Sequence, residues 1–366
     1  MSGINSRILI MAGGTGGHIF PALAIAEALQ LQGIQVDWLG SKHGMENALV
    51  HKAGIPLHRI AARGIAGKGL IRLLMAPFMI VTATFQALRI VRTLKPDCVL
   101  GLGGFVSGPG GLAAWLNGRP LLIHEQNAVA GITNRFLSRL AFRILESFAG
   151  TFPGKAGVIH TGNPVRAEIL ALHGRNRDIG QSHRPLRILV LGGSQGAKAI
   201  NQVIPEMLTH WPPNERPQIR HQTGPAHLEG AMAMYRDQGM ETGNGIEIQA
   251  FIEDMGSAFS WADLVIARSG ASTVCELAVA GLPSVLIPYP WHRDQQQLRN
   301  ATWLLNAGAA LIVQQHELSS DRLAAIVRGL DINRERILAM SESASKAAIV
   351  DATQRIVNQC KEAVNV

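Results

Sequence analysis

Short apolar runs alternate with longer helical patterns along the first half of the chain. Apolar runs of four or five residues match buried β-strands, whereas longer segments with apolar residues every three or four positions match helices. The predicted strands are residues 7–11, 35–39, 98–102, 120–124 and 143–146. The predicted helices are residues 20–32, 45–53, about 70–93 and 133–140. Gly33 and Gly54 follow two of these segments, where glycine commonly ends a helix.

The second half repeats this alternation. Its predicted strands are residues 187–191, 218–222, 246–249, 264–267, 284–287 and 310–313. Strands that alternate with helices imply parallel sheets with helices on both faces, and 366 residues exceed the usual size of one core. We therefore predict an α/β protein of two doubly wound domains joined near Gly162-Asn163-Pro164. Ligands are expected beyond the carboxyl ends of the strands, in a cleft between the domains.

One predicted helix is unusually apolar. Residues 73–88 (LLMAPFMIVTATFQAL) carry no charge, and Arg72 and Arg89 flank them. A membrane-spanning helix needs about 20 apolar residues, so this run of 16 is too short to be one. Two compatible interpretations remain: a helix that packs on the sheet, or an apolar patch ringed by basic residues that rests on an anionic membrane surface.

The charge of the chain is concentrated in its first half. Residues 1–164 hold 15 Lys and Arg against 6 Asp and Glu, a balance of +9, whereas the remainder holds 19 against 20. A basic surface attracts anionic lipids, phosphorylated ligands or nucleic acid. Nucleic acid is not expected, because the chain has no basic block and only 5% aromatic residues. Three scattered cysteines and a strand pattern at the N-terminus instead of a secretory signal suggest a reducing compartment.

Two glycine-rich loops follow equivalent strands in the two halves. GGTGGH (13–18) and GGSQGAK (192–198) each lie between a strand and a helix, and a third cluster, GGFVSGPGG, spans 103–111. Such loops let backbone N–H groups approach a ligand, and the helix behind them favours an anion. Neither of the first two loops fits the dinucleotide or P-loop patterns. No Asp-x-Asp pair is present to hold a divalent metal, so we expect no cofactor and no metal.

Several polar side chains occur at predicted loop and strand ends. His18 follows the first glycine loop, and its ordinary pKa near neutrality suits removal of a proton from a hydroxyl. His124, Glu125, Gln126 and Asn127 follow an apolar strand, where side chains point toward a ligand, and Asn127 is a natural donor to a sugar hydroxyl or amide. The structural alternatives are a helix cap for His18 and a loop cap for the other four.

A Ser/Thr-rich helix start follows a predicted strand of the second half. In RSGASTVCE (268–276), hydroxyl and N–H groups suit a pyrophosphate. Glu276 is able to accept two hydrogen bonds from a ribose diol, and the alternative is a surface glutamate on a well-capped helix. Downstream, Gln296 lies near the start of another helix and is a candidate contact to the same ligand.

Together these motifs resemble the MurG family of bacterial N-acetylglucosaminyltransferases, which convert lipid I to lipid II in peptidoglycan synthesis. The matching stretches follow the family's order over nearly the whole chain. They are GGTGGHIFPALA (13–24), GGFVSGPGGLAA (103–114), HEQNAVAG (124–131), TGNPVR (161–166), LGGSQGA (191–197), FIEDM (251–255), RSGASTVCELAVAGLPSVLIPYP (268–290) and DQQQLRNA (294–301). Phe105 departs from the tyrosine that many relatives carry, so this ring offers stacking but no phenol.

The resemblance implies a GT-B glycosyltransferase with two Rossmann-like domains. Residues 1–164 would face the acceptor and the membrane, residues 165–346 would bind UDP-GlcNAc, and a final helix at about 347–366 would pack back on the first domain. The donor-binding residues that the resemblance implies are Thr15, Gly16, Gly17, Asn127, Arg166, Ser194, the backbone of Ile252, Ala271, Ser272, Thr273, Val274, Cys275, Glu276 and Gln296. Among these, Glu276 would hold the ribose hydroxyls and Gln296 the GlcNAc.

The implied reaction is an inverting, metal-independent transfer. The C4 hydroxyl of the muramyl sugar would attack C1 of GlcNAc opposite UDP, giving a β-1,4 link on the undecaprenyl-linked acceptor. His18 is the first candidate base and Glu125 the second. Helix N-termini and Arg166 would hold the charge of the leaving UDP. The enzyme would be a peripheral protein on the cytoplasmic side of the inner membrane, beside the cell-wall synthesis machinery.

Two other functions fit parts of the pattern. A UDP-GlcNAc 2-epimerase shares the GT-B architecture, but it needs no lipid access, and the uncharged segment at 73–88 argues against it. A membrane-bound scaffold that binds a nucleotide sugar without turnover is disfavoured by His18 and the two glycine loops. Acceptor-dependent release of UDP distinguishes the transferase from both.

Overall fold

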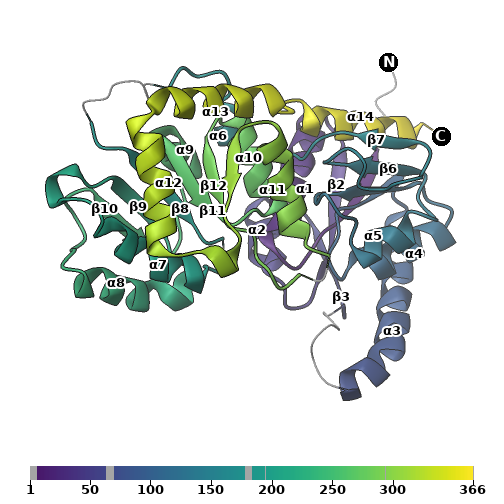
Figure 1. The fold of residues 1–366 in the computed structure, drawn as a ribbon. Helices are drawn as coiled ribbons and strands as arrows, with labels where there is room; N and C mark the ends of the chain where they lie inside the picture. The colour runs from purple at the N-terminus through teal and green to yellow at the C-terminus, as the bar shows by residue number, and fades with distance from the viewer. Residues whose placement is uncertain (1–5, 63–69, 178–183, 194, 293, 366) are drawn as a thin grey trace. The chain divides into compact units, whose positions relative to one another are not determined.

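The computed structural model describes residues 6–62, 70–177, 184–193, 195–292 and 294–365. The chain forms two compact units: a first unit of Met1–Arg166 with Asp351–Val366, and a second unit of Ala167–Val350. Each unit is built on a parallel sheet with helices on both faces (Figure 1). This confirms the predicted α/β class with doubly wound sheets.

The first unit contains a parallel sheet of seven strands within the described residues, in the order β3-β2-β1-β4-β5-β6-β7. The strands are β1 (Arg7–Met11), β2 (Gln35–Ser41), β3 (Leu57–Ile60), β4 (Cys98–Gly101), β5 (Leu121–Glu125), β6 (Arg143–Glu146) and β7 (Val158–His160). β1 lies at the centre, with Ile8 paired to Val36 on one side and to Cys98 on the other. Central strands of this kind are buried on both faces, which explains their continuous apolar sequences.

The two faces of this sheet are covered by different helices. Ile8 and Ile10 of β1 pack with α1 (Gly16–Leu31) and α14 (Ala352–Val364), whereas Leu9 and Met11 pack with α3 (Leu70–Leu94) and α4 (Ser107–Leu116). Successive side chains of a strand point to opposite faces, so one apolar run supplies both cores. The remaining helices of the first unit are α2 (Glu46–Lys52) and α5 (Ile132–Leu137).

The second unit contains a sheet of six strands in the part of the chain that the structure describes, ordered β10-β9-β8-β11-β12-β13. The strands are β8 (Arg187–Leu191), β9 (Gln218–Gln222), β10 (Ile246–Gln249), β11 (Leu264–Ala267), β12 (Ser284–Leu286) and β13 (Ala310–Ile312). The helices are α6 (Ala167–Leu170), α7 (Lys198–Leu208), α8 (Leu228–Asp237), α9 (Met255–Trp261), α10 (Ala271–Val279), α11 (Gln296–Asn306), α12 (Ser320–Ile332) and α13 (Arg334–Ala347). Ile188 and Val190 of β8 lie in a buried core with Ile204 of α7 and Val327 of α12.

All predicted strands are present, with ends that differ by two residues at most. Two strands were not predicted, β3 and β7. Both are short edge strands with partly exposed side chains, so neither carries the continuous apolar run of a central strand. Gly33 and Gly54 have φ values of 77° and 67° directly after α1 and α2, which confirms the predicted helix ends.

The third glycine cluster, residues 103–111, is not a loop over its whole length, as its grouping with the other glycine loops implied. Only its first residues form a loop, because α4 begins at Ser107 and includes two adjacent glycines. A Cβ on Gly110 would lie 2.3 Å from Met11 Sδ, and one on Gly111 would lie 2.7 Å from Leu137 Cδ2. These glycines therefore serve close packing of α4 against its neighbours, which overrides their low helix propensity.

The predicted apolar helix is α3, which extends beyond the sheet of its unit in Figure 1. No helix in the described part of the chain is long and apolar enough to cross a membrane.

At the C-terminal end of the chain, α14 lies beside α1 (Figure 1). Ile356 and Cys360 of α14 are fully buried in the core that contains Ile8. The last helix thus completes one face of the first unit and begins at Ala352.

Candidate active site

The first glycine loop connects β1 to α1. Gly14 has a φ of 97°, a conformation that favours glycine, and Thr15 is the N-cap residue of α1. Thr15 and Gly17 are exposed at this helix N-terminus, and Gly16 is buried. The loop therefore presents the start of a 16-residue helix to solvent, as an anion site requires.

A buried carboxylate supports this loop from beneath. Glu46 of α2 is fully buried, and its Oε1 accepts hydrogen bonds from Ser41 N at 2.8 Å and Ser41 Oγ at 2.7 Å. Its Oε2 accepts a longer one from Gly14 N at 3.4 Å. Sequence analysis missed Glu46, because a glutamate in the first turn of a short helix normally faces solvent.

The third glycine cluster packs against the first loop. Gly103 and Gly104 have φ values of 101° and 80°. A Cβ on Gly104 would lie 2.1 Å from Gly13 O, and one on Gly103 would lie 2.9 Å from His18 Cε1. The absence of these side chains lets two loops, about 90 residues apart in sequence, meet around the His18 ring.

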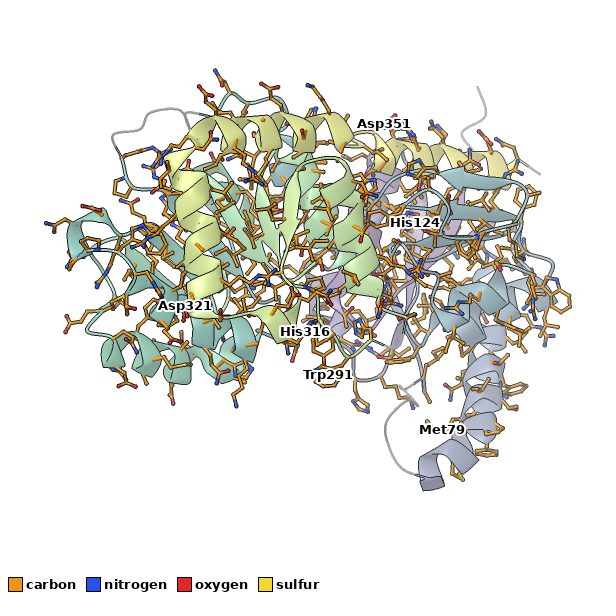
Figure 2. All side chains as sticks on the ribbon, viewed as in Figure 1. Met79, His124, Trp291, His316, Asp321 and Asp351 are labelled. Atoms are coloured by element: carbon orange, nitrogen blue, oxygen red, sulfur yellow. The ribbon has the colours of Figure 1, made fainter. Side chains whose placement is uncertain are left out.

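His18 lies in the first turn of α1, and its ring is hydrogen-bonded. His18 Nδ1 is 2.9 Å from Gln126 Oε1. Gln126 in turn contacts the ring of His124, with Nε2 and Nδ1 separated by 3.1 Å. Figure 2 shows His124 within the sheet region of the first unit, and both Gln126 and His124 are buried. The structure thus brings His18 together with Gln126 and His124, which lie more than 100 positions further along the sequence.

Glu125 occupies a different environment. Its side chain is 2% exposed and accepts four hydrogen bonds. Oε1 binds Asn127 N and Nδ2, each at 3.1 Å, while Oε2 binds Gly131 N at 3.0 Å and Asn134 Nδ2 at 2.9 Å. A carboxylate bonded in this way is fixed as the anchor of the loop from 125 to 131. This geometry favours His18 over Glu125 as a base.

Asn127 and Arg166 also belong to the first unit. Asn127 is partly exposed beside Glu125, and its carbonyl accepts a hydrogen bond from Thr151 Oγ1 at 3.2 Å. The Arg166 guanidinium carbon lies 5.6 Å from the ring centre of Phe20, two residues after His18 on α1. This cation–π contact holds the cation near the start of α1.

In the second unit, the glycine loop after β8 is shaped by its neighbours. Gly196 has a φ of 78°, and a Cβ there would lie 2.0 Å from Thr223 O. Gln222 Nε2 donates to Gly193 O at 3.1 Å, and Gln222 Oε1 accepts from Ile252 N at 3.0 Å. Gln222 therefore ties the loop to the segment of Ile252, whose N–H is already bonded. The predicted contact at Ser194 lies outside the described residues.

The helix start predicted for pyrophosphate is α10, with Gly270 as its N-cap residue. Ser269 Oγ donates to Gln297 O at 2.8 Å, and Asn300 Nδ2 donates to Ser269 O at 3.2 Å, so α11 fixes this turn. Ala271 is buried, whereas Ser272 and Thr273 are partly exposed at the first turn. Val274 and Cys275 are buried behind them in the helix.

Glu276 and Gln296 complete the predicted donor site. Glu276 is 8% exposed, which excludes the alternative of a surface glutamate. Gln296 begins α11, and its Nε2 donates to Asp294 Oδ2 at 3.1 Å. Gln295 before it has a φ of 49°, which a residue with a side chain adopts only at a cost of about 1 kcal/mol or more. Among the described residues, no group of three His, Cys, Asp or Glu is placed to hold a metal.

An apolar groove of about 570 Å³ opens beside α3 in the first unit. Its lining residues come from α3, α4, α5 and the segments next to them. They are Ala61, Ala62, Met79, Ile80, Ala83, Thr84, Phe105, Gly108, Pro109, Leu112, Ile132, Thr133 and Phe136. Figure 2 shows Met79 on the extended part of α3.

α3 also exposes apolar side chains that do not line the groove. Phe78 is 68% exposed, Val81 66% and Phe85 52%, and Arg89 stacks on the Phe85 ring at 4.4 Å. Several exposed apolar side chains on one helix are typical of an interaction surface.

Two parallel-sheet units of this topology, each with a glycine loop between its first strand and first helix, form the GT-B architecture. The glycosyltransferase family 28 N-terminal domain matches residues 8–146, and the C-terminal domain of the same family matches residues 187–356. The chain belongs to the MurG family, within glycosyltransferase family 28.

Similar proteins cover nearly the full length. A relative from Marinobacter nauticus is 47% identical over 98% of both chains. Another, from Stutzerimonas stutzeri, is 49% identical, also over 98% of both. Both are named UDP-N-acetylglucosamine–N-acetylmuramyl-(pentapeptide) pyrophosphoryl-undecaprenol N-acetylglucosamine transferase. The crystal structure of Acinetobacter baumannii MurG is 44% identical in sequence and superposes with a TM-score of 0.82. The match covers 98% of this chain and 99% of that one.

Proposed function

We propose that this protein transfers GlcNAc from UDP-GlcNAc to the C4 hydroxyl of the muramyl sugar of undecaprenyl-pyrophosphoryl-MurNAc-pentapeptide. The product is the β-1,4-linked disaccharide lipid of peptidoglycan synthesis. The observation that carries the proposal is the identity of 47–49% over 98% of the chain to transferases named for this reaction. The same identity disfavours the 2-epimerase alternative.

The donor is assigned to the second unit. The partly exposed first turn of α10 offers Ser272 and Thr273 to the pyrophosphate, and the helix dipole favours its negative charge. Buried Glu276 suits the ribose hydroxyls, and Gln296 suits the GlcNAc. Since Ile252 N already donates to Gln222, its carbonyl is the backbone group that would accept the uracil N3–H.

The acceptor is assigned to the first unit, where His18 is the proposed base. The loop N–H groups of Thr15, Gly16 and Gly17 would face the sugar and the phosphates of the donor, together with Asn127 and Arg166. The acceptor C4 hydroxyl loses its proton to His18 as its oxygen bonds to C1 of GlcNAc. The bond from C1 to the UDP oxygen breaks on the opposite face, so the configuration inverts. Helix N-termini and Arg166 take the place of a metal in stabilising the charge of UDP.

The apolar groove and the exposed face of α3 are assigned to the lipid side of the reaction. The acceptor is a polyprenyl pyrophosphate, whose tail stays in a membrane. The first half of the chain carries the balance of +9, which favours an anionic lipid surface. We place the enzyme as a peripheral protein on the cytoplasmic face of the inner membrane, with the cell-wall synthesis machinery as its protein partners.

The test is transfer of labelled GlcNAc from UDP-GlcNAc to a lipid I analogue in the presence of EDTA. Wild type is compared with His18→Ala and Glu276→Ala. We expect metal-independent transfer by wild type, a loss of 10²-fold or more in kcat for His18→Ala at unchanged donor affinity, and weaker donor binding for Glu276→Ala. Absence of transfer by a folded, donor-binding wild type would overturn the proposed function.

A further inference from the structure

A chain of hydrogen bonds links a backbone carbonyl to the ring of His18. His124 Nε2 lies 3.0 Å from Gly162 O, and His124 Nδ1 lies 3.1 Å from Gln126 Nε2. The other end of the Gln126 amide, Oε1, lies 2.9 Å from His18 Nδ1. The chain therefore runs from Gly162 through two side chains to the proposed base, and all four residues belong to the first unit.

The Gly162 carbonyl determines which nitrogen carries a hydrogen at each step of this hydrogen-bonded series. A carbonyl oxygen only accepts, so His124 Nε2 carries a hydrogen, and a neutral His124 then has a lone pair on Nδ1. Nδ1 must receive a hydrogen from the Gln126 NH₂ group, which turns Gln126 Oε1 toward His18. Oε1 also only accepts, so His18 Nδ1 carries a hydrogen. The lone pair of the neutral His18 ring is therefore on Nε2.

Two further contacts support this assignment. Gln126 Nε2 lies 3.4 Å from His124 O, a second acceptor for the same NH₂ group, whereas an amide oxygen turned that way would be repelled. Burial lowers the pKa of His124 from 6.5 to about 4, so its ring is neutral near pH 7. Ser147 Oγ, 3.3 Å from His124 Nε2, is able to accept a share of the same N–H.

We propose that Gln126 and His124 are positioning residues that hold His18 in the Nδ1–H tautomer, with its Nε2 lone pair available to the acceptor hydroxyl. The inference rests on the proposed function, in which His18 takes that proton. Gln126 contributes direction as well as tautomer, because its bond to Nδ1 fixes the plane of the ring. Neither residue touches the reacting atoms.

The direct test is the tautomer of His18 in the wild-type protein. In ¹⁵N-histidine-labelled protein at pH 7.5, long-range ¹H–¹⁵N spectra distinguish a protonated ring nitrogen from an unprotonated one. The signals of His18 are assigned by their loss in His18→Ala. We expect a protonated Nδ1 and an unprotonated Nε2 in His18. A protonated Nε2 would overturn the proposal whatever the activity of the enzyme.

The kinetic test uses Gln126→Met, which keeps the side-chain length and removes both hydrogen bonds. A wrong tautomer fixed in place costs up to about 10⁴-fold in kcat in a serine protease. Here the ring would become free to adopt either tautomer, so we expect a smaller loss, roughly 10-fold, in kcat with unchanged KM for UDP-GlcNAc. The control is Gln30→Met on the exposed surface of α1, which should match wild type.

Gln126→Glu separates positioning from a merely structural effect. One carboxylate oxygen would still accept from His18 Nδ1–H, so the tautomer should persist. The other oxygen would replace the NH₂ group that faces His124 Nδ1, so kcat should recover only in part relative to Gln126→Met. The carboxylate beside His18 should also move the acid limb of the kcat profile to higher pH. A kcat within two-fold of wild type for folded Gln126→Met would overturn the proposal. Unchanged kcat in His18→Ala would instead overturn the assignment of the base.

Discussion

At the scale of single residues, the candidate site contains carboxylates and imidazoles that are held by defined hydrogen-bond partners. Glu125 accepts four hydrogen bonds from the loop that follows it and from Asn134 of α5. Glu46 accepts from Ser41 and from Gly14 of the first glycine loop. Buried acceptors of this kind are costly to alter, because every donor that loses its partner stays desolvated. Such residues hold the loops around them in place.

Glu125→Gln tests this role. The substitution replaces one acceptor oxygen with an NH₂ group that faces Gly131 N or Asn127 N, so we expect the free energy of unfolding to fall by about 2 kcal/mol or more. Thermal and urea unfolding measure the loss, and Glu27→Gln on the exposed face of α1 is the control. A variant of unchanged stability whose kcat falls 10²-fold would instead make Glu125 the base.

The pH dependence of stability provides a second residue-scale prediction. Burial lowers the pKa of His221 from 6.5 to about 3, where its ring bonds Tyr235 and Asn201. Between these values the unfolded chain binds a proton that the folded protein does not, so stability falls as pH decreases from 6.5 toward 3. His221→Gln should remove part of this decline, on the order of a few kcal/mol. The free energy of unfolding is measured at several pH values for both proteins. The same decline with decreasing pH in wild type and His221→Gln would contradict the prediction.

At the scale of elements, helices are held at close range by glycine. α4 packs on the sheet through Gly110, where a Cβ would lie 2.7 Å from Leu39 Cδ2 as well as close to Met11. We expect Gly110→Ala to destabilise the protein by about 1–3 kcal/mol despite the higher helix propensity of alanine. Gly329→Ala in α12, where a Cβ meets nothing within 4 Å, should stabilise it by about 0.5–1 kcal/mol. Urea unfolding measures the change in the free energy of unfolding for both variants. Changes of opposite sign would confirm this contrast, and changes of the same sign would refute it.

The exposed face of α3 gives a second prediction at this scale. Substituting Phe78, Val81 and Phe85 with serine removes three side chains that are more than half exposed. Each inserted apolar side chain contributes on the order of 1–2 kcal/mol to membrane binding, so vesicle affinity should fall 10-fold or more while UDP-GlcNAc affinity is kept. Leu31→Ser and Ile332→Ser, also exposed but on other helices, are the controls. An equal loss of vesicle affinity in the controls would show that any exposed apolar side chain contributes, and that α3 is not a specific membrane contact.

At the scale of the whole molecule, charge is divided between the two halves of the chain. The balance of +9 in residues 1–164 lies in the unit that carries the apolar face of α3, while the remainder is at −1. We expect cosedimentation with vesicles to require anionic lipid and to weaken several-fold between 50 and 500 mM NaCl, since salt screens exposed charges. Binding to neutral vesicles that is insensitive to salt would contradict this electrostatic contribution.

The sequence by itself determined the class of fold, the central strands and the glycine loops. Central strands of a parallel sheet are continuous apolar runs, and loops that approach a phosphate need glycine, so both appear as local patterns. It also determined the family, because the motifs follow one another in a fixed order along the chain. The edge strands β3 and β7 escaped prediction because their half-exposed residues leave no such pattern.

Only the tertiary structure decided which partners the polar residues of the candidate site have. His18 and Gln126 meet across 108 positions of sequence, and Glu46 reaches Gly14 across 32. Nothing local distinguishes a base from an anchor in the run His124 to Asn127, since burial and hydrogen-bond partners depend on how strands and loops pack. The packing left Glu125 bonded on both oxygens and joined His18 to Gln126, because a buried polar group without a partner costs free energy.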